Sequence, residues 1–228
     1  MHLEFKKFKR NKRLNFLNIN IRFDLMNILL HPTYFPSISH YVAMLQATSI
    51  TFEVEDNFQK QTNRNRMYIY SPNGVQLLNI PIKHSKDQRQ KYKDVKIEND
   101  FNWQKNHFKS LEAAYRTSPY FEFFEDDIAP LFEKKHTFLM DLNFEIYAIL
   151  KDCLGIELPF EKTSEYFHEV TNFKDYRNLA NGKKDTFNND RYIQVFNEKH
   201  GFISNLSILD LLFNEGRHAK DYLMKQTL

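Results

Sequence analysis

One segment of this chain constrains the fold more than any other, the run His31-Pro32-Thr33-Tyr34-Phe35-Pro36. It follows directly on an apolar stretch, and residues 26–30 read as a short buried strand. Each proline fixes its own φ angle at about −65° and removes a backbone donor, and it pushes the residue before it toward extended geometry. The strand therefore has to leave its sheet as a stiff loop. Because sheets that alternate with helices bind ligands just beyond the carboxyl ends of their strands, this loop is a candidate floor for a site.

Apolar periodicity predicts the order of elements in the rest of the chain. In the first half of the chain we expect a helix over residues 40–48 capped by Ser37 or Ser39, strands over 49–54 and 95–97, and a hairpin of 67–70 with 75–82. In the second half we expect a helix over 103–115, one or two short helices within 120–135, a long helix over 137–154, a return to the sheet at 158–160, a helix over 208–213 and a last helix after it. The turn Ser71-Pro72-Asn73-Gly74 favours the hairpin, and Ser207 with Asp210 resembles a capping arrangement. Residues 171–190 are polar and read as a long exposed loop or a lid.

This order of elements indicates a single domain of the mixed α/β class. We expect a mixed sheet that includes an N-terminal strand-loop-helix unit and a β-hairpin, covered by a mainly helical C-terminal half. The domain would span residues 26–228. Residues 1–25 hold seven Lys or Arg and two acidic residues. Because they lack the apolar core of a secretory signal, they read as a basic flexible tail or as the product of an upstream start codon.

The charge distribution argues against a nucleic-acid partner. The chain has 32 Lys or Arg and 29 Asp or Glu residues, and once residues 1–25 are set aside, 25 basic and 27 acidic residues remain. The folded body therefore has no overall basic footprint. No stretch of about 18 apolar residues occurs, so we expect no stable membrane insertion. The single cysteine, Cys153, reads as a buried hydrophobe, and a chain without an internal disulfide fits the reducing cytoplasm.

The sequence carries no recognisable cofactor or metal motif. Its five glycines form neither a Gly-x-Gly-x-x-Gly fingerprint nor a phosphate-binding loop, and no Gly-x-Ser-x-Gly elbow occurs. The nine histidines show neither His-x-His nor His-Glu-x-x-His spacing. No metal site is therefore predicted, and the cofactor stays unknown.

Two residues are predicted to carry catalysis. The imidazole of His31 has an ordinary pKa of about 6.5, so it can act as a general base near neutral pH. Glu55 follows the second strand and would orient that imidazole or bind an amine, with Asp56 as the alternative for the same role. The competing interpretation of Glu55 is an ordinary surface carboxylate.

Two arginines are predicted to bind an anionic group. If residues 63–66 are extended, Arg64 and Arg66 point to one face, where their guanidinium forks suit a carboxylate or a diphosphate. Lys60 adds a cation that a sugar site could use, and Asn65 would help to shape the pocket. The competing interpretation is a solvated strand whose arginines pair with nearby acidic residues.

Four further residues are predicted to contribute to a substrate pocket, and they are Tyr34, Trp103, Asn205 and Glu215. Trp103 shares a helix face with His107, and its ring would stack on a sugar or, in the competing interpretation, pack in the core. Asn205 and Glu215 bracket a very apolar helix, for which capping is the alternative role.

Five blocks of this sequence, taken together, resemble the WbqC-like family. They are residues 26–36, residues 58–66, Trp103 with His107, residues 118–121 and residues 205–216. They occur in the family's order and span nearly the whole chain. The family is associated with bacterial O-antigen and surface-polysaccharide gene clusters and has been suggested to transfer glycine onto sugars. The resemblance therefore implies a transferase that moves a small acyl or aminoacyl group, with glycine as one candidate, to an amino sugar or a sugar nucleotide.

Two other functions stay open. The turn over residues 31–40 is similar in length and proline placement to the nucleotide-binding turn of the HIGH-type nucleotidyltransferases. It lacks their early glycine, and Ser39-His40 stands where they have Gly-His. That likeness implies nucleotidyl or adenylyl transfer, with His40 on phosphate. The third function is a non-enzymatic binding or scaffold protein in glycan assembly, with the arginine and histidine positions dispersed on the surface. The oligomeric state is left open.

Overall fold

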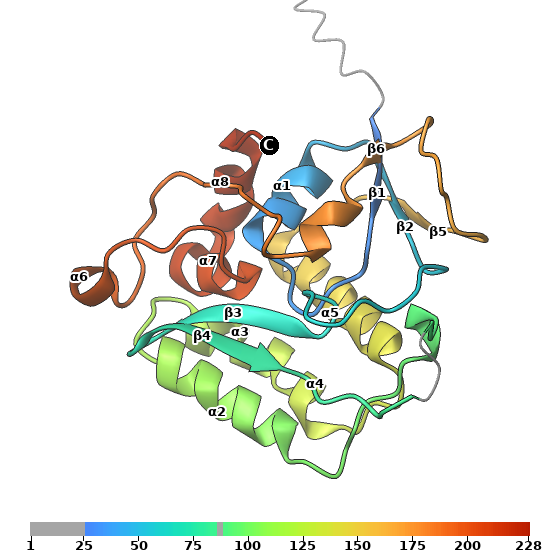
Figure 1. Cartoon of the computed structure of the whole chain (residues 1–228). Coiled ribbons are helices and arrows are strands. Elements are labelled where there is room, and N and C mark those ends of the chain that lie inside the picture. Colours follow the sequence, from blue (N-terminus) through green and yellow to red (C-terminus); the bar gives the residue numbers. More distant parts are fainter. Residues whose placement is uncertain (1–25, 86–88) are drawn as a thin grey trace, which may run out of the picture.

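A four-stranded parallel sheet forms one half of the computed structural model, which describes residues 26–85 and 89–228 (Figure 1). Its strands are β1 (Asn27–Leu30), β2 (Ser49–Phe52), β5 (Phe160–Lys162) and β6 (Lys174–Asp175). Their order in the sheet is β5-β2-β1-β6. The strands predicted at 26–30, 49–54 and 158–160 are confirmed, with boundaries that differ by up to two residues. The expected tail over residues 1–25 lies outside the described residues.

The first strand, helix and second strand form the predicted strand-loop-helix unit. Helix α1 (Ile38–Leu45) joins β1 to the parallel strand β2. The helix begins two residues earlier than predicted, because the extended Ser37 (ψ 161°) is its N-cap residue. It also ends three residues earlier. The Thr48 N–H donates to the Met26 carbonyl (3.1 Å), so at Thr48 the chain already pairs with the residue that precedes β1 and is no longer helical.

The predicted hairpin is confirmed, and it forms a separate antiparallel sheet. Strand β3 (Arg66–Ser71) pairs with β4 (Gly74–Asn79). The two-residue turn between them ends at Gly74, whose φ of +93° suits a residue without a Cβ. The parallel strands and the antiparallel hairpin thus form two separate sheets, where we expected one mixed sheet. The strand predicted over 95–97 is reduced to isolated bridges, such as that between Ile82 and Ile97.

Helices make up most of the second half of the chain, as predicted. They are α2 (Trp103–Tyr115), α3 (Phe121–Ile128), α4 (Pro130–Glu133), α5 (Leu139–Leu154), α6 (Asn197–His200), α7 (Ile208–Glu215) and α8 (Ala219–Lys225), with 3₁₀ turns η1 (Tyr92–Asp94), η2 (Arg177–Ala180) and η3 (Gly216–His218). Gly155 follows the last residue of helix α5 and has a φ of +60°, the left-handed geometry that often ends a helix. Ser207 caps α7 by accepting from the Leu209 N–H (3.3 Å), but Asp210 takes no part in the cap, because it is fully buried and accepts from Tyr115 Oη (2.9 Å).

The prediction of one long exposed loop over residues 171–190 is wrong in part. Strand β6 and the turn η2 lie inside this segment, and β6 pairs in parallel with β1. The side chains of Leu179 and Ala180 are buried. This segment therefore closes one edge of the parallel sheet.

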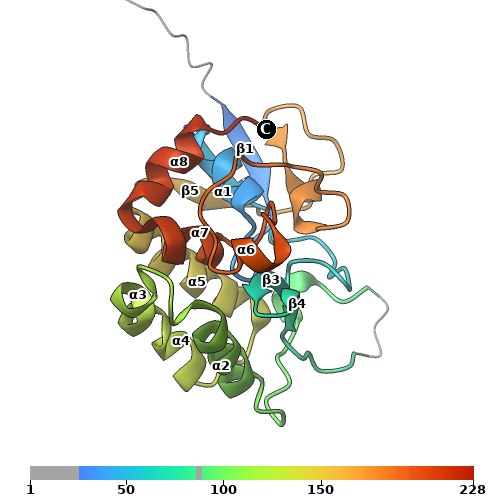
Figure 2. The ribbon, with the colours of Figure 1, turned by 90° about the vertical axis from the view of Figure 1, so that its left-hand side faces the viewer.

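The two sheets share one core. Helices α1, α7 and α8 lie beside the parallel sheet in Figure 1 and in front of it when the molecule is turned (Figure 2). Helix α2 packs against β3 of the hairpin. The carboxyl ends of β1 and β2 point toward the hairpin and α5 (Figure 1). Within residues 26–85 and 89–228, no helix has the length and apolarity needed to cross a membrane.

Candidate functional site

Three parallel strands end at one small cavity. His31 follows β1, Asp56 lies four residues beyond β2, and Asp175 is the last residue of β6. The cavity has a volume of about 240 Å³ and is called the His31 pocket below. Its lining residues are His31, Asp56, Gln59, Arg64, Tyr166, Asp175, Arg177, Asn178, Asn181 and Lys184. The stiff loop after β1 thus supplies part of a site beyond the carboxyl ends of the strands, where open α/β sheets bind ligands.

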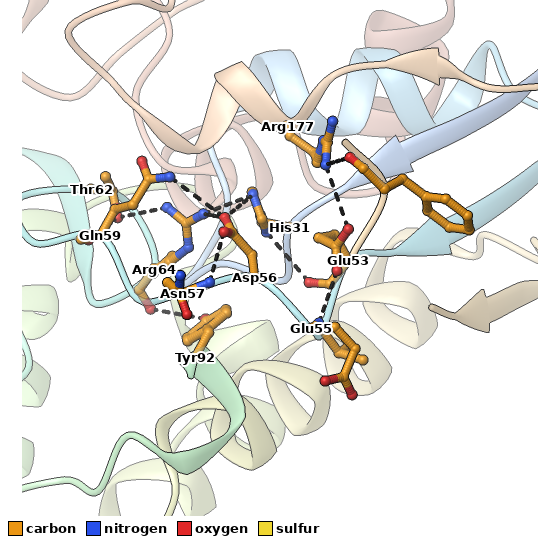
Figure 3. Close-up of polar contacts among 12 residues, drawn as sticks. His31, Glu53, Glu55, Asp56, Asn57, Gln59, Thr62, Arg64, Tyr92 and Arg177 are labelled. Atoms are coloured by element: carbon orange, nitrogen blue, oxygen red, sulfur yellow. Dashed lines mark hydrogen bonds and ion pairs between the residues drawn. The ribbon is translucent and has the colours of Figure 1, made fainter. Parts of the chain in front are cut away.

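The hydrogen bonds of His31 define which ring nitrogen carries the proton (Figure 3). Its Nε2 lies 2.7 Å from Arg64 Nη2. An arginine only donates, so Nε2 accepts, and the neutral ring carries its proton on Nδ1. That Nδ1 lies 3.4 Å from the Glu53 carbonyl oxygen, which accepts from it. The lone pair of His31 therefore faces Arg64.

Asp56 completes a triangle with His31 and Arg64. Its Oδ2 accepts from Arg64 Nη2 at 2.9 Å and lies 3.3 Å from His31 Nε2. The Asn57 N–H donates to its other oxygen (2.7 Å). Arg64 is only 1% exposed, and its Nη1 also donates to Thr62 Oγ1 (3.3 Å). One guanidinium nitrogen thus bridges a carboxylate and an imidazole inside the protein.

Burial and charge set the protonation states of this triangle. Burial lowers the pKa of His31 to about 4, because the nearby Asp56 carboxylate, which favours the protonated ring, only partly offsets burial, and the charge of Arg64 adds to the lowering. Burial alone would raise the pKa of Asp56, but the contacts with His31 and Arg64 outweigh burial and hold this pKa below its usual value. At neutral pH, His31 is therefore a neutral imidazole beside an ionised carboxylate.

A second charged group borders the pocket. Arg177 forms a bidentate pair with Asp175, with Nε–Oδ1 at 3.0 Å and Nη2–Oδ2 at 2.7 Å. Its Nη1 also lies 3.5 Å from Oε2 of Glu53, which is fully buried. Thr163 Oγ1 donates to the other oxygen of Glu53 (2.9 Å). These contacts tie β6 to the loop after β2 and close the pocket at the β1–β6 edge.

The structure does not bring Glu55 to His31. The Glu55 carboxylate pairs with Lys93 (Nζ–Oε1 2.6 Å), and Asp56 occupies the place beside the imidazole. Strand β2 ends at Phe52, so strand alternation no longer decides where the side chains after it point. The alternative that assigned this role to Asp56 is the one that matches the geometry.

Arg64 and Arg66 point to different places, contrary to the prediction. Residues 57–65 form turns and bridges, and β3 begins only at Arg66. Within this segment Gln61 has a φ of +62°, which breaks the extended alternation. Arg64 lines the His31 pocket, whereas Arg66, Asn65 and Lys60 line a second hollow of about 440 Å³, called the Lys60 pocket below.

Tyr34 and Trp103 lie in the core. Tyr34 Oη and His107 Nδ1 form a hydrogen bond of 2.8 Å, and the Tyr34 and Trp103 rings pack edge to face with their centroids 6.5 Å apart. Tyr34 is 1% and Trp103 4% exposed. The core interpretation of this helix stripe is therefore the one that matches. Glu215 is half-buried at the end of α7 and does not line the His31 pocket.

Asn205 closes the N-terminus of α1. Its Oδ1 accepts from the Ser39 N–H (3.0 Å), and its Nδ2 donates to Asp185 Oδ2 (2.8 Å). The Ile38 N–H donates to a backbone carbonyl at residue 206 (3.0 Å). His40, in the first turn, is fully buried, and burial lowers its pKa to about 4. The donors that a phosphate would need at this helix end already have protein acceptors.

Several lining residues of the His31 pocket were not singled out from the sequence. Asp175, Arg177, Asn181 and Lys184 all come from the segment that reads as a polar loop. Strand β6 has two exposed residues and no apolar pattern, so the sequence offers no local signal for it. In the described part of the chain, no group of three or more His, Cys, Asp or Glu side chains is placed to hold a metal ion.

Comparison with known proteins gives a family for this chain. Residues 31–194, well over half of the chain, match the WbqC-like protein family. The chain is also 29% identical over 203 residues to the "Uncharacterized protein Rv1507c" of Mycobacterium tuberculosis (strain ATCC 25618 / H37Rv), a match that covers 75% of this chain and 87% of the relative. No solved structure matches significantly.

Proposed function

This chain belongs to the WbqC-like protein family, and we propose that it is a transferase of surface-polysaccharide biosynthesis that moves a small acyl or aminoacyl group onto an amino sugar or sugar nucleotide. Glycine is one candidate for the transferred group. The observation that carries the proposal is the buried triangle of His31, Asp56 and Arg64 in a polar cavity at the strand ends. Such a triangle provides a neutral imidazole, a carboxylate and a cation at one point, and acyl transfer to an amine uses all three.

The size and lining of the His31 pocket favour one sugar ring or one amino acid. Its volume of about 240 Å³ lies below the range of about 300–1,000 Å³ that is usual for drug-sized ligands. Three amide side chains line it, those of Gln59, Asn178 and Asn181. Amides both donate and accept, as the hydroxyl groups of a sugar require. A whole sugar nucleotide would have to extend beyond this cavity.

In the proposed reaction the acceptor amine attacks the carbonyl carbon of the donor. A carbon–nitrogen bond forms, the bond from the carbonyl carbon to the leaving group breaks, and the amine proton passes through His31 Nε2 to the leaving group. An imidazole with a pKa of about 4 is a weak base. It therefore takes the proton once the attacking nitrogen has gained positive charge, and the Asp56 carboxylate at 3.3 Å stabilises the imidazolium that results.

Arg64 has to yield its place at Nε2 before that proton can move. Its Nη2 donates to both His31 (2.7 Å) and Asp56 (2.9 Å), so Asp56 retains the guanidinium when the contact with His31 is broken. The displaced guanidinium then stays close to the reacting carbonyl oxygen and stabilises the negative charge that develops there. In the free protein, the same contact keeps the imidazole lone pair occupied.

The two other candidate functions find less support. Nucleotidyl transfer at residues 31–40 would need free N–H groups at the start of α1 and an accessible His40, but those donors are occupied and His40 is fully buried. A scaffold role would leave the arginine and histidine positions dispersed, whereas His31 and Arg64 are buried side by side. The cytoplasm remains the proposed location, on the ground of the single cysteine.

The proposal is tested by mass spectrometry of reaction mixtures. The full chain is incubated with an amino-sugar acceptor such as glucosamine or its uridine-diphosphate form, and with acetyl-coenzyme A or a glycyl thioester, donors whose carbonyl carbon already carries a leaving group. We expect the acceptor to gain one acetyl or glycyl group. In His31→Asn the gain is expected to disappear, because asparagine keeps a donor near the position of Nδ1 and has no counterpart of Nε2.

A matched control separates loss of chemistry from loss of fold. His218 is exposed on the turn η3, so His218→Asn is expected to keep both the thermal midpoint and the product. The His31 variant should keep a cooperative thermal transition. A His31→Asn protein that forms product at the rate of the parent chain removes the proposed base.

A further inference from the structure

The Lys60 pocket is a second concave site, and its charge differs from that of the His31 pocket. Its volume is about 440 Å³. Three cationic side chains line it, those of Lys60, Arg66 and Lys83, and its described lining contains no Asp or Glu. By contrast, two carboxylates in the lining of the His31 pocket pair with two of its three cations, Asp56 with Arg64 and Asp175 with Arg177. From this asymmetry we propose that the Lys60 pocket binds the phosphate or diphosphate group of a ligand.

The guanidinium of Arg66 is held in place through its Nε, which leaves its two Nη groups able to donate to a ligand. Its Nε donates to Asn79 Oδ1 (3.1 Å), and Asn65 Nδ2 donates to the same oxygen (3.1 Å) and to the Ile80 carbonyl (2.9 Å). These bonds fix the plane of the guanidinium. In the part of the chain that the structure describes, its two Nη groups have no protein acceptor, so both can donate to one oxyanion.

The two lysines of the pocket also lack a carboxylate partner. Among the described residues, neither Lys60 nor Lys83 forms an ion pair, whereas the nearby Lys93 is neutralised by Glu55 at 2.6 Å. Three like charges around one hollow repel each other, and a bound anion removes that repulsion. Gln61 at the rim holds a φ of +62°, a backbone strain that is common where the chain clamps a ligand.

The size of the pocket distinguishes the ligands that it suits. About 440 Å³ falls within the usual range for small-molecule sites, which is about 300–1,000 Å³. A diphosphate with an attached group therefore fits, and the amide of Gln61 can donate to its further oxygens, whereas Gln90 Nε2 already donates to the Asp94 carbonyl (3.0 Å). The shared chemistry is the diphosphate, which can come from free pyrophosphate or from a nucleotide such as uridine diphosphate.

This site is separate from the proposed base, although one segment borders both pockets. Gln59 and Arg64 line the His31 pocket, whereas Lys60, Gln61 and Asn65 line the Lys60 pocket. Residues 59–65 thus form a wall between the two. Anion binding does not depend on the transfer reaction, and variants on the two sides of this wall can be examined independently.

The experiment is isothermal titration of the full chain with inorganic pyrophosphate and with uridine diphosphate, at low salt. The variant is Lys60→Gln combined with Lys83→Gln, and both lysines are exposed, so the fold should be retained. Its control is Lys105→Gln combined with Lys109→Gln, which removes the same charge from exposed positions on α2. We expect the pocket variant to weaken binding by about tenfold or more, and the control by less than about twofold.

Each outcome bears on the proposal. Equal affinity for the two probes supports a site for the free anion, and tighter binding of uridine diphosphate supports a nucleotide ligand. His31→Asn is expected to bind both probes as the parent chain does, so a failed transfer reaction would leave this site standing. The proposal is overturned if the parent chain binds neither probe at millimolar concentration, or if the two double variants weaken binding equally.

Discussion

Three buried histidines should make this protein lose stability as the pH falls from 7 to 5. Burial is the main cause that lowers the pKa of His31, His40 and His107 from 6.5 to about 4 in each case. Between these two values the unfolded chain binds a proton at each position and the folded chain does not. Stability is therefore fully present above pH 6.5, and it falls as the pH drops toward 4, because acid favours the state that takes up protons.

The magnitude follows from the number of protons. A folded pKa of about 4 and an unfolded value of 6.5 give a loss of about 2 kcal/mol per histidine between pH 7 and pH 5. Three histidines lose about 5 kcal/mol together, a large part of the about 5–15 kcal/mol that stabilises a typical domain. Near pH 5.5 the free energy of unfolding should change by about 3.5 kcal/mol per pH unit.

Urea unfolding at a series of pH values measures this slope. The fluorescence of Trp103, the single tryptophan, reports on unfolding, since its side chain is 4% exposed in the core. In His107→Gln the slope near pH 5.5 should fall by about one third, whatever the variant does to stability at pH 7. In Asn106→Gln, which changes an exposed side chain on α2 that carries no titrating group, the slope should not change.

Asp210 acts in the opposite direction and has to be considered in the comparison. Burial raises the pKa of its carboxyl, despite hydrogen bonds from Tyr192, Gln194 and Tyr115 that lower it, so the folded chain binds this proton first as the pH falls. Its contribution is the same in every histidine variant and cancels from the difference in slope. The reasoning is refuted if the stability of the parent chain is constant within about 1 kcal/mol between pH 7 and pH 5, or if His107→Gln keeps the full slope.

Two further substitutions test the packing. Gly216→Ala should cost about 2–4 kcal/mol in urea unfolding, since φ is +55° and the added Cβ would lie 2.6 Å from the Tyr120 ring; a loss below 1 kcal/mol would mean that this ring moves freely. Tyr115→Phe should cost about 2–3 kcal/mol, because its hydroxyl donates to Asp210 (2.9 Å) and accepts from a backbone N–H of β3 (3.0 Å). Tyr147→Phe is the matched control, as the buried hydroxyl of Tyr147 has no hydrogen-bond partner among the described residues; equal losses in the two tyrosine variants would show that the hydrogen bonds do not matter.

Much of the fold could be predicted from the sequence, because strong local patterns coincide with the elements. Helix α2 begins and ends at the predicted residues, since its apolar stripe runs from Trp103 to Tyr115. The hairpin is confirmed because the turn before Gly74 requires residues that favour tight turns. The separation of the hairpin from the parallel sheet has no such signal. It depends on which strand edges meet, and period-2 alternation does not specify the partner of a strand.

Of the residues in the candidate site, only His31 could be placed correctly from the sequence. His31 follows a buried strand, and the sequence places it at a strand end whatever the strand's neighbours are. Its partner carboxylate depends on the backbone after Phe52, where a change of one residue decides between Glu55 and Asp56. The direction of the Arg64 side chain could not be predicted for the same reason, because the turn at Gln61 changes where the side chains that follow it point. The residue types in the sequence therefore indicate a charged site. Which residues belong to it can be known only from the three-dimensional path of the chain.

The opposite wall of the His31 pocket depends on long-range pairing alone. Strand β6 consists of two exposed residues that pair with Ile28 and Leu29 of β1. The Tyr176 N–H continues this ladder by donating to the Leu29 carbonyl (2.9 Å). Pairing with the open edge of β1 thus fixes the position of this otherwise polar segment. The same pairing brings Arg177 to the loop after β2, where its Nη1 lies 3.5 Å from Glu53 Oε2. Because the same pairing positions Asp175 at the cavity, the pocket forms only when that edge of the sheet is closed.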